Sequence, residues 1–398
     1  MFFWSRKTVP FPNEPERVGA LPLAMRVQMV LGISGTPKDR YRFAPPILCF
    51  IVINVIPKVF FKYVNLQSTI LGMAEFCFQL NALIGVALLM VKNEELKLLM
   101  KQLEEFAANG FRHSPPNIIL HLEFNQMHIH KHAIGICKML FYAVNFFNVM
   151  PIVSSLWTYY YFRHHQNTTF EFSIPIEMNF YNWDIKNSVV KYTFFEVLIN
   201  GINYLIAVSV ALKSVTVYSL SKYCILYFQL VGLELETLAQ DSSDWPQQLK
   251  SIVRKHQTAH DCAKLLETVT APLLLLQLSL CVAMCSIMLL FFTISNGFGT
   301  QFMNLFILFV VTITESFMYC ILGDQLSSEG LRVAQTVYGS FSWENVSASM
   351  MKQLQFMMLQ AQQPIGLTGG KFFFLSVEQF GKIIKTTYSI FLVLKDAI

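Results

Sequence analysis

Seven apolar runs recur along the chain, separated by polar or basic segments. They lie at residues 45–61, 69–91, 133–161, 192–213, 272–295, 302–322 and 372–394. Because a helix needs about 20 mostly apolar residues to cross a bilayer, runs of this kind indicate membrane-spanning helices. The pattern therefore predicts an all-α membrane protein with seven transmembrane helices.

The last apolar run carries more charge than a helix surrounded by lipid tolerates. Glu378, Lys382 and Lys385 lie inside it, and each charge near the bilayer centre costs several kcal/mol. With an advance of about 100° per residue, these three side chains fall on one stripe of the helix. The same stripe holds Thr386, Ser389, Val393 and Asp396. A spanning helix with one wet stripe either packs that face among neighbouring helices or lines a pore.

The segments at 92–132 and 214–271 keep a helical spacing of apolar residues although they are polar overall. Leu96, Leu99 and Leu103 repeat in the first segment, and Leu226 and Leu230 in the second. This spacing predicts amphipathic helices that continue beyond the membrane. Because exposed apolar faces promote association, we expect these extensions to form an intracellular anchor bundle that packs subunits together.

Composition and charge agree with a membrane protein and give its orientation. Apolar residues make up 54% of the chain and charged residues only 14%, against about 25% charged in soluble domains. Basic residues gather in the segments at 1–44, 92–132, 214–271 and 324–371, and the other side of the membrane holds little beyond Lys62, Arg163, Lys186 and Lys395. The positive-inside rule therefore predicts a cytosolic N-terminus and an extracellular C-terminus, the inverse of a G-protein-coupled receptor.

Several functional classes lack the motifs on which they depend. The chain has no Walker loop, no His-Glu-x-x-His and no Gly-x-Ser-x-Gly, so we expect neither an enzyme nor a cofactor. His128 and His132 share a helix face but have no third ligand, so no metal site is expected. The basic residues are spread between apolar runs rather than clustered, which argues against nucleic acid as a partner. No internal repeat of the kind found in carriers is visible.

The carboxyl-terminal region carries an ordered set of short motifs. They are YCILGDQLSSE at 319–329, QAQQP at 360–364, GGKFF at 369–373, Leu375-Ser376, Phe380 and Thr387-Tyr388-Ser389. In this order and at this spacing, the set resembles the carboxyl-terminal signature of the insect odorant receptors. Members of that family are seven-helix subunits that form odour-gated cation channels with a shared co-receptor. One departure is Gln360, where the family usually has Arg.

The resemblance implies an odorant receptor subunit of a ligand-gated, non-selective cation channel in the plasma membrane of sensory neuron dendrites. Co-receptors of that family carry a long insertion between their fourth and fifth spans, whereas this chain has only residues 218–271 there. We therefore expect the variable, odour-binding subunit, which assembles with the co-receptor as a heterotetramer and binds a small volatile odorant. The alternative is a seven-helix chemoreceptor that signals through a soluble partner such as a G protein.

A site for small apolar odorants requires a closed pocket of aromatic and methionine side chains with one or two polar groups. The outer half of the third span has this composition, and Met150, Ser154 and Trp157 share one of its faces. The family resemblance places the pocket among the second, third, fourth and sixth spans. The predicted ligand-binding residues are Met73, Phe76, Phe147, Met150, Ser154, Trp157, Ile199, Asn203, Met303 and Phe306. Ordinary aromatic core packing is the competing interpretation of each position.

The last span supplies the predicted pore. Its pore and gate residues are Lys382, Thr386, Ser389, Ile390, Val393 and Ala397. Val393 interrupts the polar stripe, and an apolar ring in a wet conduit closes a channel by dewetting. The competing interpretation is that Val393 packs against its neighbours.

The predicted topology also gives a glycosylation site and four segments. Asn167-Thr168-Thr169 is a sequon in the longest outer loop, which predicts a glycan on Asn167. We expect a cytosolic segment at 1–44, six spans with the pocket at 45–323, a cytosolic anchor segment at 324–371 and the pore-lining span at 372–398.

Overall fold

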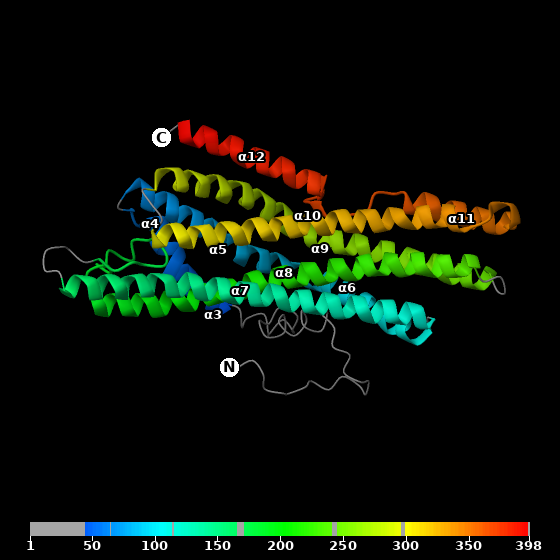
Figure 1. Ribbon diagram of the computed structural model, residues 1–398, viewed down its shortest axis with the longest axis horizontal. Coiled ribbons are helices and arrows are strands. Elements are labelled where there is room, and N and C mark those ends of the chain that lie inside the picture. Colours follow the sequence, from blue (N-terminus) through cyan, green and yellow to red (C-terminus); the bar gives the residue numbers. More distant parts are fainter. Residues whose placement is uncertain are drawn as a thin grey trace.

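The computed structural model describes residues 44–63, 65–113, 115–164, 171–240, 245–295 and 299–396, and nearly all of them are helical (Figure 1). The helices are α3 (Ala44–Phe50), η2 (Ile51–Val55), α4 (Ile56–Phe60), α5 (Leu66–Val91), α6 (Asn93–His113), α7 (Pro116–His164), α8 (Val189–Gln240), α9 (Trp245–Ile294), α10 (Thr300–Ser340), η3 (Trp343–Asn345), α11 (Ala348–Ala361) and α12 (Val377–Asp396). Two short strands, β1 (Thr368–Gly369) and β2 (Phe373–Phe374), precede α12. Asn167, Ala397 and all but the last residue of the predicted segment 1–44 lie outside the described residues.

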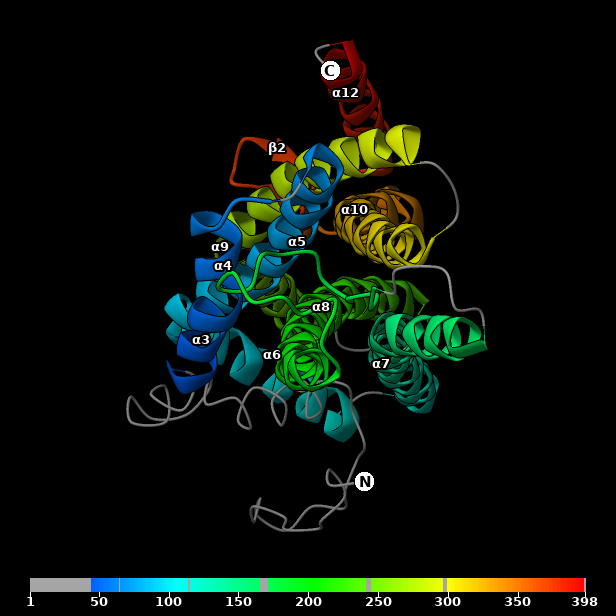
Figure 2. The same cartoon turned by 90° about the vertical axis from the view of Figure 1, so that its left-hand side faces the viewer.

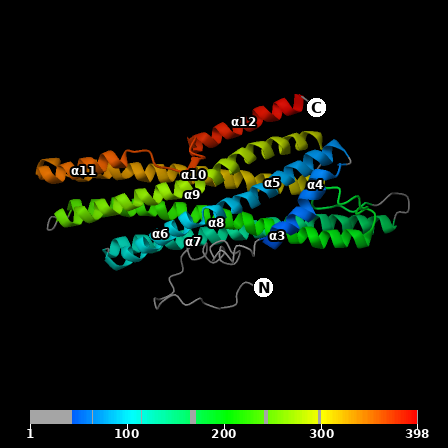
Figure 3. The ribbon, with the colours of Figure 1, turned by 180° about the vertical axis from the view of Figure 1, so that it is seen from behind.

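The helices form an elongated bundle with two recognisable halves (Figures 1 and 3). One half holds α3, α4, α5, the outer ends of α7–α10 and α12. The other half holds α6, α11 and the far ends of α7–α10. Viewed along the bundle, α8 lies at its centre and α12 stands at its flank, against α9 and α10 (Figure 2).

The predicted spans divide into three kinds. Among the described residues, α5, α7, α8, α9 and α10 are long and apolar enough to cross a membrane. The first predicted span is a shorter apolar helix, Ala44–Phe60, which contains one π-helical turn. The last is α12, which is 20 residues long but carries Glu378, Lys382 and Lys385.

Four helices continue well past the length that a membrane requires. Helix α8 runs without a break for 52 residues, or about 78 Å at 1.5 Å per residue. The fourth span therefore continues without a break into the first part of the extension predicted at 214–271, and the second part, from Trp245, belongs to α9. The segment predicted at 92–132 is likewise divided, between α6 and the start of α7, because the Pro115-Pro116 pair disfavours a continuous helix there.

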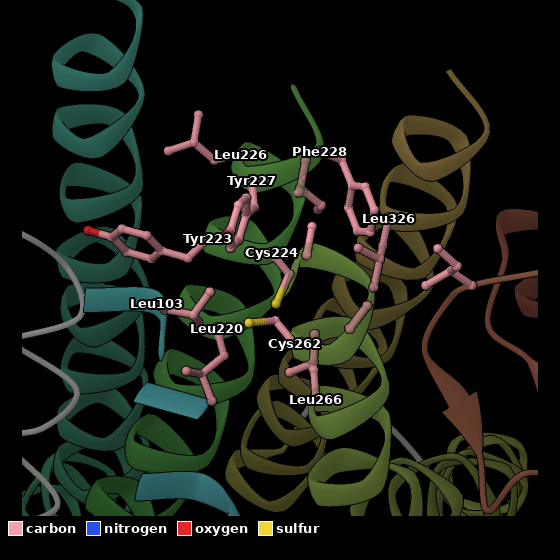
Figure 4. Packing of buried hydrophobic residues seen from close by; sticks show 14 of the residues in the cluster. Leu103, Leu220, Tyr223, Cys224, Leu226, Tyr227, Phe228, Cys262, Leu266 and Leu326 are labelled. Carbon is pink, nitrogen blue, oxygen red and sulfur yellow. The ribbon is translucent and has the colours of Figure 1, made fainter. Parts of the chain in front are cut away.

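The extensions pack around a large buried cluster of apolar side chains. Figure 4 shows residues of α8 and α9 within it, where the sulfur atoms of Cys224 and Cys262 are directed toward each other. His256 and His260 are buried in the same half of α9. Burial, helped by the neighbouring His260, lowers the pKa of His256 to about 4. His256 is therefore uncharged at neutral pH and behaves as part of this core.

Candidate functional site

A cavity lies between α5, α7, α8 and α10. It has an empty volume of about 540 Å³, part of which is open to solvent. The cavity is lined by Glu75, Phe78 and Gln79 of α5; Leu140, Ala143, Val144 and Phe147 of α7; Asn203, Ile206, Ala207 and Val210 of α8; and Ile307, Leu308 and Val311 of α10. A mostly apolar lining with a few polar groups is typical of a small-molecule site.

Two buried amide pairs hold polar side chains in the cavity wall. The Asn54 Nδ2 atom donates a hydrogen bond of 2.7 Å to Gln79 Oε1, which joins η2 to α5. The Asn203 Nδ2 atom donates a bond of 2.7 Å to Asn148 Oδ1, which joins α8 to α7. Because an unpaired amide in such a place is costly, these pairs fix the positions of Gln79 and Asn203.

An ionic cluster connects the cavity wall to the segment at 171–188. The ammonium group of Lys58 lies 3.0 Å from Glu75 Oε2, and both side chains are buried. The backbone N–H of Glu177 donates to the same oxygen atom at 3.0 Å. The carboxylate of Glu177 then pairs with Lys186 at 3.2 Å and accepts a bond of 3.0 Å from Gln301 Nε2. One cluster therefore joins α4, α5, this segment and α10.

The segment at 171–188 covers the end of the bundle next to the cavity. Its buried apolar side chains pack with Phe147 of the cavity wall. They are Phe172, Ile174, Ile176, Met178 and Phe180, and Pro175 and Glu177 between them are buried as well. The Asn304 Nδ2 atom also bonds the carbonyl oxygens of Phe147 and Pro175, at 3.3 and 3.4 Å. The segment is therefore tied directly to residues that line the cavity.

A second buried polar cluster lies toward the other half of the bundle. The ammonium group of Lys213 donates to Gln277 Oε1 at 2.6 Å and pairs with Glu315 at 3.2 Å. Glu315 Oε1 also accepts hydrogen bonds from Ser214 at 2.6 Å and from Tyr319 at 2.8 Å. This cluster connects α8, α9 and α10 a turn beyond the cavity residues Val210 and Val311.

Gly85 of α5 leaves room for the Lys213 side chain. A Cβ atom built on Gly85 would lie 2.7 Å from Lys213 Cδ. Asn81, one turn earlier on α5, donates a hydrogen bond of 2.8 Å to Gln277 Oε1. Helix α5 thereby joins the same cluster, and its glycine is explained by the close approach.

Helix α12 is attached to α10 at its first residues. Ser376 Oγ accepts a hydrogen bond of 3.0 Å from the N–H of Gln379 and so caps the helix. Asp324 of α10 accepts a bond of 3.0 Å from the N–H of Val377. Immediately before them, the Leu375 N–H donates to Leu367 O at 2.8 Å. These bonds fix the place where α12 leaves α10.

Beyond its first turn, α12 presents only one narrow stripe to the bundle. Ile383, Thr387 and Phe391 are its buried residues, spaced four apart. The hydroxyl of Ser286 on α9 donates to the Thr387 carbonyl oxygen at 3.0 Å. The predicted pore residues lie on the exposed part of α12 in the single subunit: Lys382, Thr386, Ser389, Ile390 and Val393. Their role in a pore stays a prediction.

The charges on the exposed face of α12 are partly paired. Lys382 lies 2.8 Å from Glu378, one turn earlier, and both side chains are exposed. Lys385 makes no ion pair with any described residue. The exposed face therefore carries a compensated pair near its start and, one turn later, a lysine that pairs with no described carboxylate.

The structure places two of the ten predicted ligand-binding residues in the cavity wall, Phe147 and Asn203. Ile199 is buried beside Phe147 in the cluster under the 171–188 segment. Ser154 accepts a hydrogen bond of 3.0 Å from Thr300. Phe76, Met150 and Met303 are half-buried, and Met73, Trp157 and Phe306 are exposed, with Trp157 73% exposed.

The cavity residues that were not predicted lie deeper along the same helices. Leu140, Ala143 and Val144 lie beyond the predicted aromatic face of α7, toward the half of the bundle that holds α6 and α11, and Ile206 and Val210 follow Asn203 in the same direction on α8. A signal for this depth is present in the sequence. Glu75 and Gln79 are polar residues four apart in an otherwise apolar run, and intramembrane polar residues are expected to mark functional sites.

Gly323 offers a test of how α12 is held. A Cβ atom at Gly323 would lie 2.9 Å from Leu375 Cβ and closer still to the Leu375 carbonyl oxygen. Since both sides of this contact include backbone, Gly323→Ala should push residue 375 away from α10 at a cost of about 1–3 kcal/mol. We expect a several-fold smaller maximal ligand-evoked current at equal surface delivery.

Gly339 on the same helix provides the matched control. A Cβ atom there meets no described heavy atom within 4 Å, so Gly339→Ala should leave the current unchanged. Wild-type currents from a Gly323→Ala receptor would show that the contact with Leu375 does not position α12.

Comparison with known proteins identifies relatives of this chain. The family model described as 7tm Odorant receptor matches residues 72–388. Odorant receptor 13a of Drosophila melanogaster is 28% identical over 192 residues, 45% of this chain and 46% of that protein. The odorant receptor coreceptor of Harpegnathos saltator is 28% identical over 85 residues, 21% of this chain and 18% of that protein. The chain thus spans about half the length of the first of these curated relatives, and less of the second.

A solved structure shares the fold over almost its whole length. The structure of the insect olfactory receptor OR5 from Machilis hrabei in complex with eugenol is similar with a TM-score of 0.77, covering 95% of this chain and 98% of that chain at 13% identity. Together with the family match, this likeness confirms the predicted all-α, seven-helix membrane fold with helices that continue beyond the membrane.

Proposed function

We propose, from the premise that the chain belongs to the 7tm odorant receptor family, that it is the odour-binding subunit of an odour-gated, non-selective cation channel. The observation that carries this proposal is the cavity of about 540 Å³ between α5, α7, α8 and α10. It is mostly apolar, has three polar side chains in its wall and is covered by the 171–188 segment. Such a lining suits a small volatile odorant, and the comparison receptor OR5 was solved in complex with eugenol.

The exposed face of α12 supports a pore that is completed by other subunits. In the single subunit, Lys382, Thr386 and Ser389 are exposed on a helix of spanning length. Such a polar face is unsuitable for lipid, and contact with water in a pore satisfies it. The assembly we propose is a heterotetramer with the family's co-receptor in the plasma membrane of sensory neuron dendrites. Each subunit contributes its last helix to the pore.

Electrical recording from transfected cells tests this function. The chain is expressed with and without a co-receptor, and current is recorded during application of an odorant panel while G-protein signalling is blocked. We expect odour-evoked cation current that requires both subunits and is unaffected by the block. Current that disappears with the block would favour the alternative, a chemoreceptor that signals through a soluble partner.

The orientation of the chain is a separate prediction. A tag at the N-terminus should bind antibody only after permeabilisation, and a tag at the C-terminus should bind it on intact cells, because the basic residues gather on the cytosolic side. Asn167→Gln should remove a glycan-dependent shift in gel mobility. A second sequon, Asn345-Val346-Ser347, lies in the predicted cytosolic segment 324–371. The reverse tag pattern, or a shift that depends on Asn345, would contradict the predicted topology.

A further inference from the structure

The polar side chains of the cavity wall lie at similar depths along the bundle. Helices α5 and α8 are in contact and both run from the end covered by the 171–188 segment toward the anchor (Figure 1). One contact between α5 and α8 is that of Gly85 with the side chain of Lys213. Glu75 and Asn203 each precede that contact by ten residues, and at 1.5 Å per residue they lie at about the same depth. Gln79 follows one turn deeper on α5.

Hydrogen-bond accounting leaves each of these side chains with an unused group. Gln79 Oε1 accepts from Asn54, and no described residue pairs with Gln79 Nε2. Glu75 Oε2 accepts from Lys58 and from the Glu177 N–H, and Glu75 Oε1 has no partner in the described part of the chain. Asn203 Nδ2 donates to Asn148, and Asn203 Oδ1 has no partner within the described ranges. The wall therefore offers a donor and two acceptors.

A hydroxyl group matches this set because it donates and accepts at once. An ether, ester or aldehyde only accepts, and would leave the acceptors of Glu75 and Asn203 unpaired. If the amide groups of both Gln79 and Asn203 are rotated by 180°, Gln79 offers an acceptor and Asn203 offers a donor. The wall then still presents one donor and two acceptors to a hydroxyl group. The other eleven lining residues are apolar and fit a hydrocarbon body.

The charges near the cavity exclude an ionised ligand. Lys58 and Lys186 balance Glu75 and Glu177, with pair distances of 3.0 and 3.2 Å. No spare charge remains in this cluster to neutralise a carboxylate or an ammonium group. A charged ligand without a partner is strongly disfavoured in a buried site.

We propose that this cavity selects neutral odorants that carry a hydroxyl group on an apolar body, and that Gln79 and Asn203 are the residues that recognise the hydroxyl. The inference rests on the proposed odorant-binding function and adds the ligand class.

The test compares matched ligands on matched variants. The full chain is expressed with the co-receptor, and effective doses are measured for primary alcohols from hexyl to decyl and for the methyl ether, acetate, acid and amine of each chain length. One hydrogen bond in such a site corresponds to about a tenfold change in dose. We expect each effective alcohol to act at a dose about tenfold below its methyl ether.

Four variants separate recognition from structural support. Asn203→Leu and Gln79→Met should reduce the preference for alcohol over ether to less than about threefold, because they remove one hydrogen bond to the ligand. Asn148→Leu and Asn54→Leu break the same amide pairs from partners that do not line the cavity. These two loosen Gln79 and Asn203 without removing them, so they should keep more of the preference than Asn203→Leu and Gln79→Met, even if they lower surface delivery.

The outcomes distinguish this inference from the function on which it rests. Three results would overturn the inference without affecting the proposed odorant receptor function. They are equal effective doses for alcohols and ethers, a best response to acids or amines, and an equal loss of the preference for alcohols in all four variants. A receptor that reaches the surface with the co-receptor and responds to no odorant of any class would overturn the proposed function itself.

Discussion

Val393→Gln raises the current that flows without odour, or changes ion selectivity, if α12 lines the pore as proposed. The Val393 side chain is 69% exposed in the single subunit and interrupts the polar stripe of α12. An apolar constriction closes a wet conduit by dewetting, and a polar amide at the same place lets water remain. We expect a several-fold increase in resting current, measured with the corresponding change made in the co-receptor so that every subunit contributes the amide.

Two other residues of α12 serve as controls. Phe391 is buried against α9, so Phe391→Gln should reduce surface delivery rather than open the channel. Ile384 is 38% exposed and lies off the polar stripe, so Ile384→Gln should leave the resting current near wild type. Unchanged resting current and permeability in the Val393 variant at normal surface delivery would remove Val393 from the gate.

Lys213→Met destabilises the subunit strongly because it leaves Glu315 buried without its cation. Lys213 is fully buried, and Glu315 is 7% exposed. Removing one partner of a buried ion pair typically costs about 3–5 kcal/mol, since the remaining charge is uncompensated. We expect a large loss of surface protein and a lower melting temperature of the receptor in detergent.

A second substitution should recover much of this loss. In Lys213→Met combined with Glu315→Gln, the remaining charge is gone, while the amide oxygen of the new side chain can still accept from Ser214 and Tyr319. Lys191, an exposed lysine at the start of the same helix, gives the matched control, and Lys191→Met should behave as wild type. A double variant as unstable as the single one would show that the charge balance is not what the pair supplies.

The sequence predicted the helices well because a membrane imposes a simple rule on backbone polar groups. With no water to bond them, spanning segments must be helical, and an apolar run of sufficient length marks each one. The long extensions were also predictable, since Leu96, Leu99 and Leu103 keep a helical spacing outside the membrane and are buried in the structure. The break between α6 and α7 was missed, although Pro115 and Pro116 mark it.

The cavity was harder to predict because the spacing of apolar residues shows which face of a helix is buried, but not at which level along the helix a cavity lies. An aromatic face such as Met150, Ser154 and Trp157 repeats with the same spacing whether it faces a cavity, a neighbour or lipid, and Trp157 is exposed here. Charged residues inside apolar runs indicate the contacts between helices better than the aromatic face does. Lys58 pairs with Glu75, and Lys213 with Glu315, so each marks a level at which helices are locked together.

The contacts of α12 connect the proposed gate to α9 as well as to α10. Asp324 and Gly323 of α10 hold the start of the helix. Further along, the Thr387 carbonyl oxygen accepts a hydrogen bond from Ser286 of α9, and Phe391, two residues before Val393, is buried. A tilt of α12 alone would break these contacts, whereas a joint movement of α9 and α12 keeps them. The proposed pore would therefore widen by a displacement of the two helices together rather than by a hinge at the start of α12.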